Sequence, residues 1–152
     1  MDKKDLKLLD VLQNQGRISI SELATQLNMS DTPCLRRVKK LEQDKVITGY
    51  SAQLDSQKLG WNVVVFAFIR LTENSDELGE AFEQAVKELK PVMECSVVTG
   101  AHDYLLKIVA KDLVSYERFV KKSLGSLKCI SSIESTVVLK QNFARTALPV
   151  ME

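Results

Sequence analysis

The stretch of residues 30–42 constrains the fold of this chain most, because it combines a helix start, an apolar stripe and clustered cations. Ser30 can cap a helix, and Pro33 in the first turn costs little because the N–H that proline lacks has no helical partner there. The apolar stripe, at spacings of four and three residues, consists of Cys34, Val38 and Leu41. The remaining arc carries Arg36, Arg37, Lys39 and Lys40. The pattern predicts a helix whose basic side lies against nucleic acid, the alternative being the solvated face of a surface helix.

Two further helices are predicted before it. Apolar residues recur every three to four positions over residues 5–14, which indicates an amphipathic helix that stops near Gly16. Ser19 and Glu22 fit a capping box at the start of a short second helix, and Asn28 tolerates the left-handed backbone that ends it. The inward face of this second helix is Ile20, Leu23, Ala24 and Leu27. A short helix, a turn and a longer basic helix form the helix-turn-helix arrangement, whose second helix enters the major groove of DNA.

The predicted DNA-binding residues divide by their position on this arrangement. The first turn of a recognition helix points at base edges, and residues further along meet phosphates. The whole set is Arg17, Ser30, Asp31, Thr32, Leu35, Arg36, Arg37, Lys39 and Lys40. Asp31, Thr32 and Leu35 are the expected base readers. An alternative for Asp31 is stabilisation of the helix start by its negative charge.

The net charge of +1 argues at first against a nucleic-acid binder. Residues 1–50, however, hold 9 Lys and Arg against 7 Asp and Glu, and residues 36–45 hold five cations against two anions. A local basic face matters more for phosphate contact than the charge of the whole chain. The composition therefore permits a DNA-binding surface in the first third of the chain.

Other classes of site find little support in the residue content. Cys34, Cys95 and Cys129 lie far apart, and His102 is the only histidine, so we expect no metal site, no cofactor and no catalytic constellation. We interpret the cysteines as buried, reduced thiols. No window is apolar enough for a membrane span and no secretory signal is present, so we expect a cytoplasmic protein without membrane contact.

After residue 62 the pattern changes from helical spacing to apolar runs. Residues 46–54 are predicted to form a strand or small wing. Residues 63–71 are largely β-branched or aromatic, and further strands are predicted over 92–99, 104–110 and 133–139. A helix from Asn74-Ser75-Asp76 to Pro91 and a second one carrying Leu113, Tyr116, Val120, Leu124 and Leu127 lie between them. The order is β-α-β-β-α-β, the ferredoxin-like unit.

The domain boundaries follow from this pattern. We expect an α+β protein with an N-terminal (winged) helix-turn-helix over residues 1–52 and a linker over 53–62. A ferredoxin-like domain over 63–140 and a C-terminal tail over 141–152 complete the chain. In such a domain both helices cover one face of the sheet, yet the first strand is apolar on both faces. We therefore predict that two subunits bury the other face together as a homodimer, which also suits a helix-turn-helix that reads two half-sites.

The combination of these two parts resembles the Lrp/AsnC family, the "feast/famine" regulators of bacteria and archaea. The residues that carry the resemblance are Asp5, Leu8, Leu9, Leu12, Gly16-Arg17-Ile18-Ser19, Glu22-Leu23-Ala24, Ser30, Thr32-Pro33-Cys34, Arg37-Val38, Leu41-Glu42, Ile47, Gly49-Tyr50, Thr99-Gly100, Asp103-Tyr104-Leu105 and Ser135-Thr136. One departure is Asp31, where members often have proline. The resemblance covers nearly the whole chain and implies a transcription regulator of amino-acid metabolism or transport with a RAM/ACT-like second domain.

The resemblance also implies an amino-acid effector bound between subunits, and dimers that assemble further, often to octamers on which DNA bends. Transferred to this sequence, the effector-binding residues are Thr99, Gly100, Ala101, His102, Asp103, Tyr104, Ser135 and Thr136. Backbone N–H groups at a glycine turn can hold a carboxylate, and Asp103 could pair with an ammonium group. The alternative is that Gly100 and Asp103 only make the hairpin turn. His102 is the one side chain that ordinarily titrates near neutrality, so a pH-dependent role is a minor hypothesis.

Two other functions stay open at this level. Siroheme decarboxylase subunits share the family's fold, so the architecture alone leaves room for an enzyme, although no catalytic residues are evident. The chain could also be an amino-acid-binding module that regulates another protein without touching DNA, which would leave the basic helix unexplained.

Overall fold

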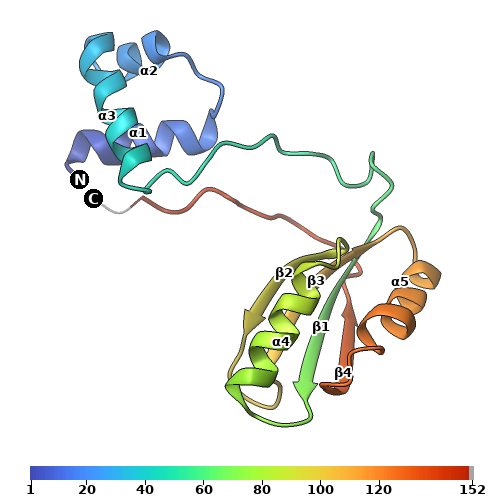
Figure 1. The fold of residues 1–152 in the computed structure, drawn as a ribbon. Coiled ribbons are helices and arrows are strands. Elements are labelled where there is room, and N and C mark those ends of the chain that lie inside the picture. The colour runs from blue at the N-terminus through green and yellow to red at the C-terminus, as the bar shows by residue number, and fades with distance from the viewer. Residues whose placement is uncertain (151–152) are drawn as a thin grey trace. The chain divides into compact units, whose positions relative to one another are not determined.

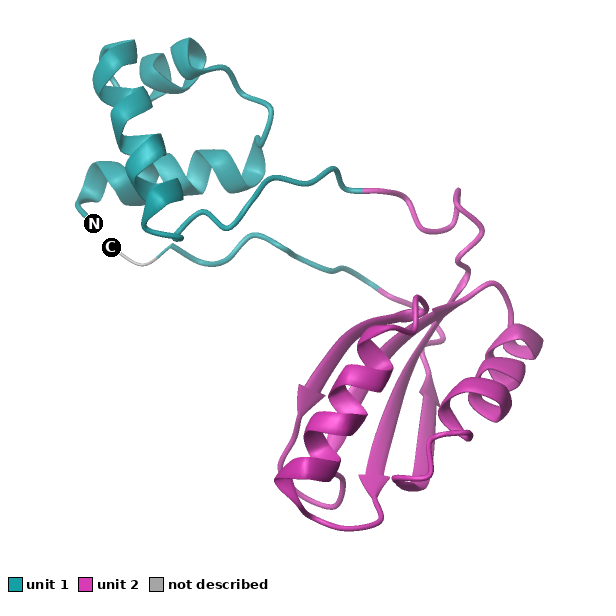
Figure 2. Cartoon of the chain, viewed as in Figure 1, with its two compact units in different colours: residues 1–53, 142–152 teal, residues 54–141 magenta. Residues whose placement is uncertain are grey.

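The computed structural model describes residues 1–150, which form two compact units. One unit comprises Met1–Gln53 and the segment from Asn142 on, and the other comprises Leu54–Gln141 (Figure 2). None of the helices in residues 1–150 has the length and apolar character needed to cross a membrane. The two units are described in turn.

The first unit is a bundle of three helices, α1 (Lys3–Asn14), α2 (Ile20–Gln26) and α3 (Asp31–Gln43) (Figure 1). Capping boxes start two of them. Asp2 and Asp5 cap each other's backbone N–H groups at the start of α1, and Ser19 and Glu22 do so for α2. The predicted box on α2 is thereby confirmed. Asn28 has the predicted left-handed backbone, with a φ of 51°, where α2 gives way to α3.

A small apolar core holds this bundle together. Its fully or almost fully buried members are Leu8, Leu23, Ala24, Cys34, Val38 and Leu41. The last three are the predicted stripe of α3, so the inward face of that helix is confirmed. Because this stripe is buried, the opposite face of α3 is left towards solvent.

One local prediction in this unit is confirmed only in part, and another is wrong. Ser30 occupies the N-cap position of α3, but its hydroxyl makes no capping hydrogen bond. Residues 46–54 form no strand. The N–H groups of Val46 and Ile47 instead both donate to the carbonyl of Leu41 at the end of α3, after Lys45 takes a left-handed backbone. A strand in this segment would also need a partner strand, which the first unit does not offer within the described residues.

The C-terminal segment packs against the first helix of the same unit. The side-chain amide of Gln13 donates to the carbonyl of Leu148 at 2.7 Å and accepts from its N–H at 2.9 Å. The side chains of Gln53 and Thr146 are joined by a hydrogen bond of 3.2 Å. Residues 142–150 thus belong to the compact unit of the helix-turn-helix.

The second unit contains a four-stranded antiparallel sheet in the order β2-β3-β1-β4. Its strands are β1 (Val63–Leu71), β2 (Val92–Val97), β3 (Tyr104–Ala110) and β4 (Ile130–Val137). Helix α4 (Asp76–Lys87) follows β1, and α5 (Leu113–Phe119) with the π-helical turn η1 (Val120–Leu124) follows β3. This is the predicted β-α-β-β-α-β order and strand pairing of a ferredoxin-like domain.

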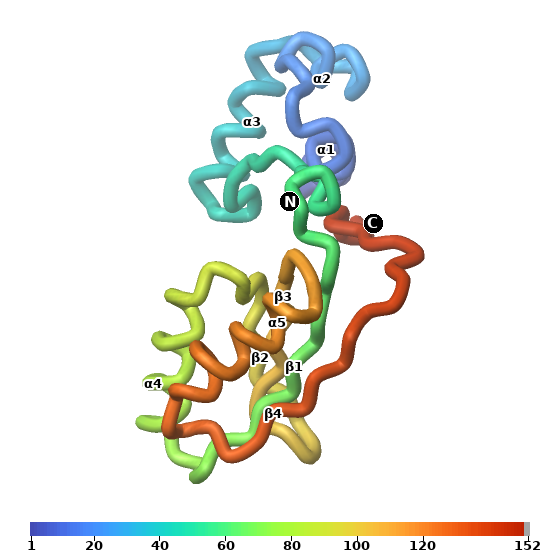
Figure 3. Tube along the Cα trace, turned by 90° about the vertical axis from the view of Figure 1, so that its right-hand side faces the viewer, coloured from blue at the N-terminus to red at the C-terminus, as the bar shows by residue number. Residues whose placement is uncertain are grey.

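Both helical segments cover the same face of this sheet (Figures 1 and 3). Phe82 and Val86 of α4 and Tyr116 of α5 share one core with alternate residues of the two central strands. Those strand residues are Val65, Ala67, Ile69, Leu71, Tyr104, Leu106, Ile108 and Ala110. The other face, which we call the open face, presents the intervening residues to solvent.

Element boundaries differ slightly from the predictions. Strand β2 ends at Val97 rather than Thr99, and β4 covers 130–137 rather than 133–139. Helix α4 ends at Lys87, before Pro91. The helix predicted from Leu113 to Leu127 is α-helical only to Phe119 and then widens into η1, where Gly125 donates to the carbonyl of Val120.

Candidate functional sites

The exposed face of α3 is basic. Its exposed side chains are Asp31, Thr32, Leu35, Arg36, Lys39, Lys40 and Gln43. Within residues 1–150, Arg36, Lys39 and Lys40 form no ion pair with an acidic side chain. These three cations therefore remain available to an external anion. Leu35 also lies outside the buried stripe and is 39% exposed.

Arg37 has a different environment from its neighbour Arg36. Its guanidinium lies 2.7 Å from an Asp2 carboxylate oxygen and 2.6 Å from one of Asp5. These hydrogen bonds, first that to Asp5 and then that to Asp2, raise the pKa of Arg37. The pKa of Asp2 is lowered, chiefly by the N–H of Asp5 and next by Arg37. Arg37 thus joins α3 to the capped start of α1.

Asp31 is also engaged within the helix-turn-helix. The hydroxyl of Ser21, in the first turn of α2, donates to its carboxylate at 2.7 Å. This bond ties the two helices together at the end where α3 begins. Arg17 and Ser30, the remaining predicted DNA-binding residues, are exposed on the loops that precede α2 and α3.

Cys34 is a buried member of the core and not a reactive group. Burial raises the pKa of its thiol, and the nearby Asp31 raises it further. A raised pKa leaves little thiolate at neutral pH, and the thiolate is the reactive form. Cys34 therefore serves to pack α3 against its neighbours. The prediction that the cysteines are buried is confirmed for Cys34, but it is wrong for Cys95, which is exposed, and Cys129 is only partly buried.

The loop between β2 and β3 contains the predicted ligand-binding turn. Gly100 has a φ of +107°, which a residue with a side chain rarely adopts. The carbonyl of Ala101 accepts hydrogen bonds from the guanidinium of Arg70. The carboxylate of Asp103 accepts from the N–H of Leu71 at 2.7 Å. Asp103 thus ties the turn to β1, and one of its oxygens remains free of hydrogen bonds from residues 1–150.

The predicted effector-binding residues divide between the two faces of the sheet. His102 lies on the open face, where its ring is 5.3 Å from that of Phe68 and its Nε2 is 3.2 Å from Glu134. Thr136 pairs with Phe66 and shares that face. Ser135 lies on the helical face, where its hydroxyl is 2.6 Å from that of Tyr116. Ser135 and Thr136 consequently cannot meet one ligand on the same face.

Tyr104 is buried on the helical face and donates its hydroxyl to Glu83 of α4 at 2.9 Å. Burial raises its pKa to about 12, with a further contribution from the hydrogen bond to Glu83. The ring packs on Phe82 at 4.7 Å between centroids. Gly79 makes room for it, because a Cβ at that position would lie 2.8 Å from the Tyr104 hydroxyl.

An acidic groove of about 590 Å³ adjoins the turn on the helical face. Asp103 and Tyr104 line it, together with the carboxylates Glu73, Asp76, Glu80 and Glu83. The sequence prediction missed the acids of α4. Their spacing of four and three residues, from Asp76 to Glu80 to Glu83, was the signal that one side of this helix is acidic.

No metal site is evident in the part of the chain that the structure describes. No group of three or more His, Cys, Asp or Glu side chains in residues 1–150 is arranged to hold a metal ion. The two sites described above are thus a basic helix face and an acidic groove beside a glycine turn.

Comparison with known proteins gives matches over both units. A family model described as Lrp/AsnC ligand binding domain matches residues 64–148, and one described as winged helix-turn-helix DNA-binding matches residues 1–48. The proline dehydrogenase transcriptional activator of Rhizobium radiobacter is 36% identical over 97% of this chain and 94% of its own length. The Bkd operon transcriptional regulator of Pseudomonas aeruginosa is 36% identical, over 99% and 98%.

The fold likewise matches solved structures. A transcriptional regulator of Neisseria meningitidis, solved in complex with L-Met, superposes with a TM-score of 0.94 at 32% identity, covering 98% of this chain and 96% of that one. All three relatives are named as transcriptional regulators and not as enzymes.

Proposed function

The chain belongs to the Lrp/AsnC family of transcriptional regulators, and from this premise we propose a specific role. It binds double-stranded DNA sequence-specifically and regulates genes of amino-acid metabolism or transport. An amino acid, bound between subunits of the C-terminal unit, controls it.

The observation that carries the proposal is the exposed basic face of α3. Arg36, Lys39 and Lys40 have no acidic partner within residues 1–150, while the opposite side of the helix is fixed in the core by Cys34 and Val38. A rigid helix with free cations on its outer side meets the main requirement for DNA, which is neutralisation of phosphates. Arg17 precedes α2 and adds a further phosphate contact.

Base reading is assigned to the start of the same helix. Thr32 and Leu35 are exposed there, and Leu35 presents an apolar surface of the kind that contacts a thymine methyl group. Asp31 and Ser30 lie beside them. Asp31 keeps its bond to Ser21 and so positions the first turn of α3 rather than reading a base by itself. Arg37 has the same indirect role through Asp2 and Asp5.

The effector site is assigned to the turn of residues 99–103, where Asp103 lines the acidic groove and His102 lies on the open face that a second subunit covers. An amino acid carries one carboxylate and one ammonium group. The exposed backbone of the turn at Gly100 suits the carboxylate, and the acids of the groove suit the ammonium group. The Neisseria relative, which was solved in complex with L-Met, supports an amino acid as the class of ligand.

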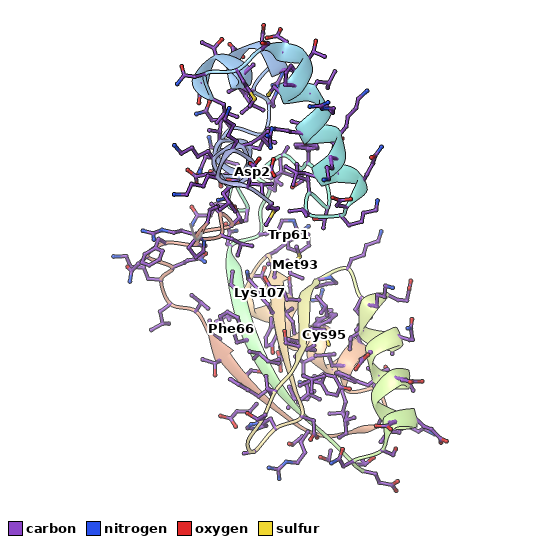
Figure 4. The ribbon with its side chains drawn as sticks, turned by 90° about the vertical axis from the view of Figure 1, so that its left-hand side faces the viewer. Asp2, Trp61, Phe66, Met93, Cys95 and Lys107 are labelled. Carbon is purple, nitrogen blue, oxygen red and sulfur yellow. The ribbon has the colours of Figure 1, made fainter. Side chains whose placement is uncertain are left out.

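The open face of the sheet supports a homodimer. Strands β1 and β3 present Val64, Phe66, Phe68, Leu105 and Val109 there, all only partly covered within one chain. Figure 4 shows Phe66 and Lys107 on the side of the sheet away from α4. Such an apolar surface is stable when a second copy covers it, and two copies also supply the two helix-turn-helix units that a symmetric operator needs.

The test combines DNA binding with a screen of the twenty amino acids. Fluorescence anisotropy on DNA from upstream of the gene should give salt-sensitive binding, and one or a few amino acids should raise the melting temperature and change the affinity for DNA. The variant Arg36→Ala/Lys39→Ala should lose DNA binding and keep the amino-acid response. Absence of salt-sensitive binding would refute a DNA-binding role. An amino acid that stabilises the protein without changing DNA affinity would refute effector control.

A further inference from the structure

Arg70 is the only charged residue of strand β1 and lies near the C-terminal end of that strand. Its neighbours Ile69 and Leu71 are buried on the helical face of the sheet. Because successive side chains of a strand alternate between faces, the side chain of Arg70 belongs to the open face, where it is exposed. Neither the basic face of α3 nor the apolar core uses this cation.

The backbone at Arg70 is fixed in an irregular part of the strand. The pairing of β1 with β4 shifts in register between Arg70 and Leu71. The hydroxyl of Ser131 donates to the carbonyls of both residues at 3.1 Å, and the N–H of Leu71 donates to the carboxylate of Asp103 at 2.7 Å. Such bulges re-aim a side chain and are frequent next to active sites. The root of the Arg70 side chain is thus held from both sides.

The guanidinium of Arg70 is oriented by a neutral group. Its Nε lies 2.9 Å from the carbonyl oxygen of Ala101, to which its Nη2 also donates. These contacts occupy one edge of the planar group. The N–H groups of Nη1 and the second N–H of Nη2 donate to no acceptor within residues 1–150. Two terminal nitrogens of an arginine can hold both oxygens of one carboxylate, so this end of the guanidinium is prepared for an anion.

No acidic side chain within residues 1–150 forms an ion pair with Arg70. The acids of the adjoining segments have other partners. Glu134 of β4 lies 3.2 Å from Nε2 of His102, and Asp103 accepts the N–H of Leu71. An arginine is charged at every physiological pH, so an oriented guanidinium without a counter-ion favours an anion from outside the chain.

The turn that orients Arg70 supplies further hydrogen-bond donors. The backbone N–H groups of residues 99–102 donate to no acceptor within residues 1–150. Gly100, with its φ of +107°, has no atom within 4 Å of the place that a Cβ would occupy, so a small molecule can approach the backbone there. Successive N–H groups in a turn attract anions. The cation and these donors therefore belong to the same turn.

We propose that Arg70 binds the α-carboxylate of the effector through its two terminal nitrogens, with backbone N–H groups of residues 99–102 completing the contact. This assignment rests on the proposed control by an amino acid, and it adds the residue that makes a free carboxylate necessary. Arg70 thereby determines specificity. An L-amino acid is bound, and its α-carboxamide, which has the same side chain and ammonium group but no negative charge, is rejected.

The test compares each amino acid with its carboxamide by isothermal titration calorimetry on the full chain. The probes are the twenty L-amino acids and their α-carboxamides, at about pH 6.5, where the α-amino groups of both are mostly protonated. The wild type should bind the acid about 10- to 100-fold more tightly than the amide, the range expected for hydrogen bonds to a charged group. Arg70→Gln should bring the two dissociation constants together. Arg70→Lys keeps the charge without the planar pair of donors and should retain part of the difference.

Arg118→Gln is the matched control, because Arg118 is an exposed arginine of the same unit without an ion pair within residues 1–150, and it should keep the wild-type ratio. An unchanged ratio of the two dissociation constants in Arg70→Gln would overturn the proposal. Equal losses of affinity for acid and carboxamide would also overturn it, because Arg70 would then only support the turn. A wild type that binds none of the twenty amino acids would instead refute the amino-acid effector itself, and this assignment with it.

Discussion

Arg36 and Arg37 are adjacent in sequence, yet the structure gives them separate roles that one pair of substitutions can distinguish. Arg36 is exposed and has no ion pair to give up within residues 1–150, so its guanidinium is free for DNA. Arg36→Ala removes a phosphate contact, so it should weaken binding to all DNA sequences alike and make the slope of log K against log salt shallower by about 0.9. Its melting temperature should stay close to that of the wild type, because the substitution breaks no ion pair within the folded unit.

Arg37→Ala should instead lower the melting temperature and have the smaller effect on DNA affinity. The variant lacks the ion pairs of 2.7 and 2.6 Å to Asp2 and Asp5 and leaves the two carboxylates without their cation. The helix-turn-helix unit should therefore melt at a lower temperature, while affinity measured well below the melting point should fall less than in Arg36→Ala. Anisotropy on operator DNA and thermal unfolding by circular dichroism provide both readouts. A loss of affinity in Arg37→Ala equal to that in Arg36→Ala, with an unchanged melting temperature, would refute this division.

Three further predictions concern stability. Phe82→Ala removes a fully buried ring from the core of the second unit and should lower its free energy of unfolding by about 3–5 kcal/mol, measured by urea denaturation. The pKa of Tyr104 is raised to about 12, so its neutral hydroxyl contributes fully to the free energy of unfolding below pH 10, and this contribution is lost as pH rises through 12. Tyr104→Phe should therefore make the free energy of unfolding depend less on pH in the alkaline range, and identical pH profiles for variant and wild type would contradict this. The pKa of Asp2 is lowered from 3.8, so its carboxylate contributes to the free energy of unfolding above that pH, and this contribution is lost as pH falls further. Asp2→Asn should therefore make the free energy of unfolding of the first unit depend less on pH in the acid range, and unchanged acid unfolding would contradict this.

The helices of the first unit were predictable because their signals are local. The Ser19 and Glu22 box lies within four consecutive residues, and the buried stripe of α3 follows from helical spacing alone. The ion pairs of Arg37 were not predictable in this way. They join residues 32 and 35 positions apart, and nothing in the sequence distinguishes Arg37 from Arg36 before the helices are packed.

The strand expected over residues 46–54 was wrong because a local sequence pattern does not show whether a partner strand is present. Alternating apolar and β-branched residues favour a strand locally, but a strand forms only when a partner offers hydrogen bonds. The end of α3 takes the N–H groups of Val46 and Ile47 instead.

In the second unit, the sheet was predictable from its apolar runs, and the spatial arrangement of the candidate effector residues only in part. Ser135 and Thr136 are neighbours in β4, and side chains of successive strand residues point to opposite faces, so one ligand cannot bind both on one face. The acidic groove was not predictable, because it forms only when α4 packs beside β2 and brings Glu83 to Tyr104 from 21 positions away in the sequence. Sequence spacing indicated an acidic side of α4 but not what it faces.

The central claim is that the exposed cations of α3 bind the phosphates of DNA, and the salt dependence of the association constant tests it most directly. The logarithm of the constant should fall linearly with the logarithm of salt concentration, with a slope of about −0.9 for each phosphate neutralised. Arg36→Ala/Lys39→Ala/Lys40→Ala should make that slope shallower by about 0.9 for each phosphate that is no longer neutralised. An unchanged slope in the triple variant, or binding by the wild type that does not respond to salt, would contradict the claim.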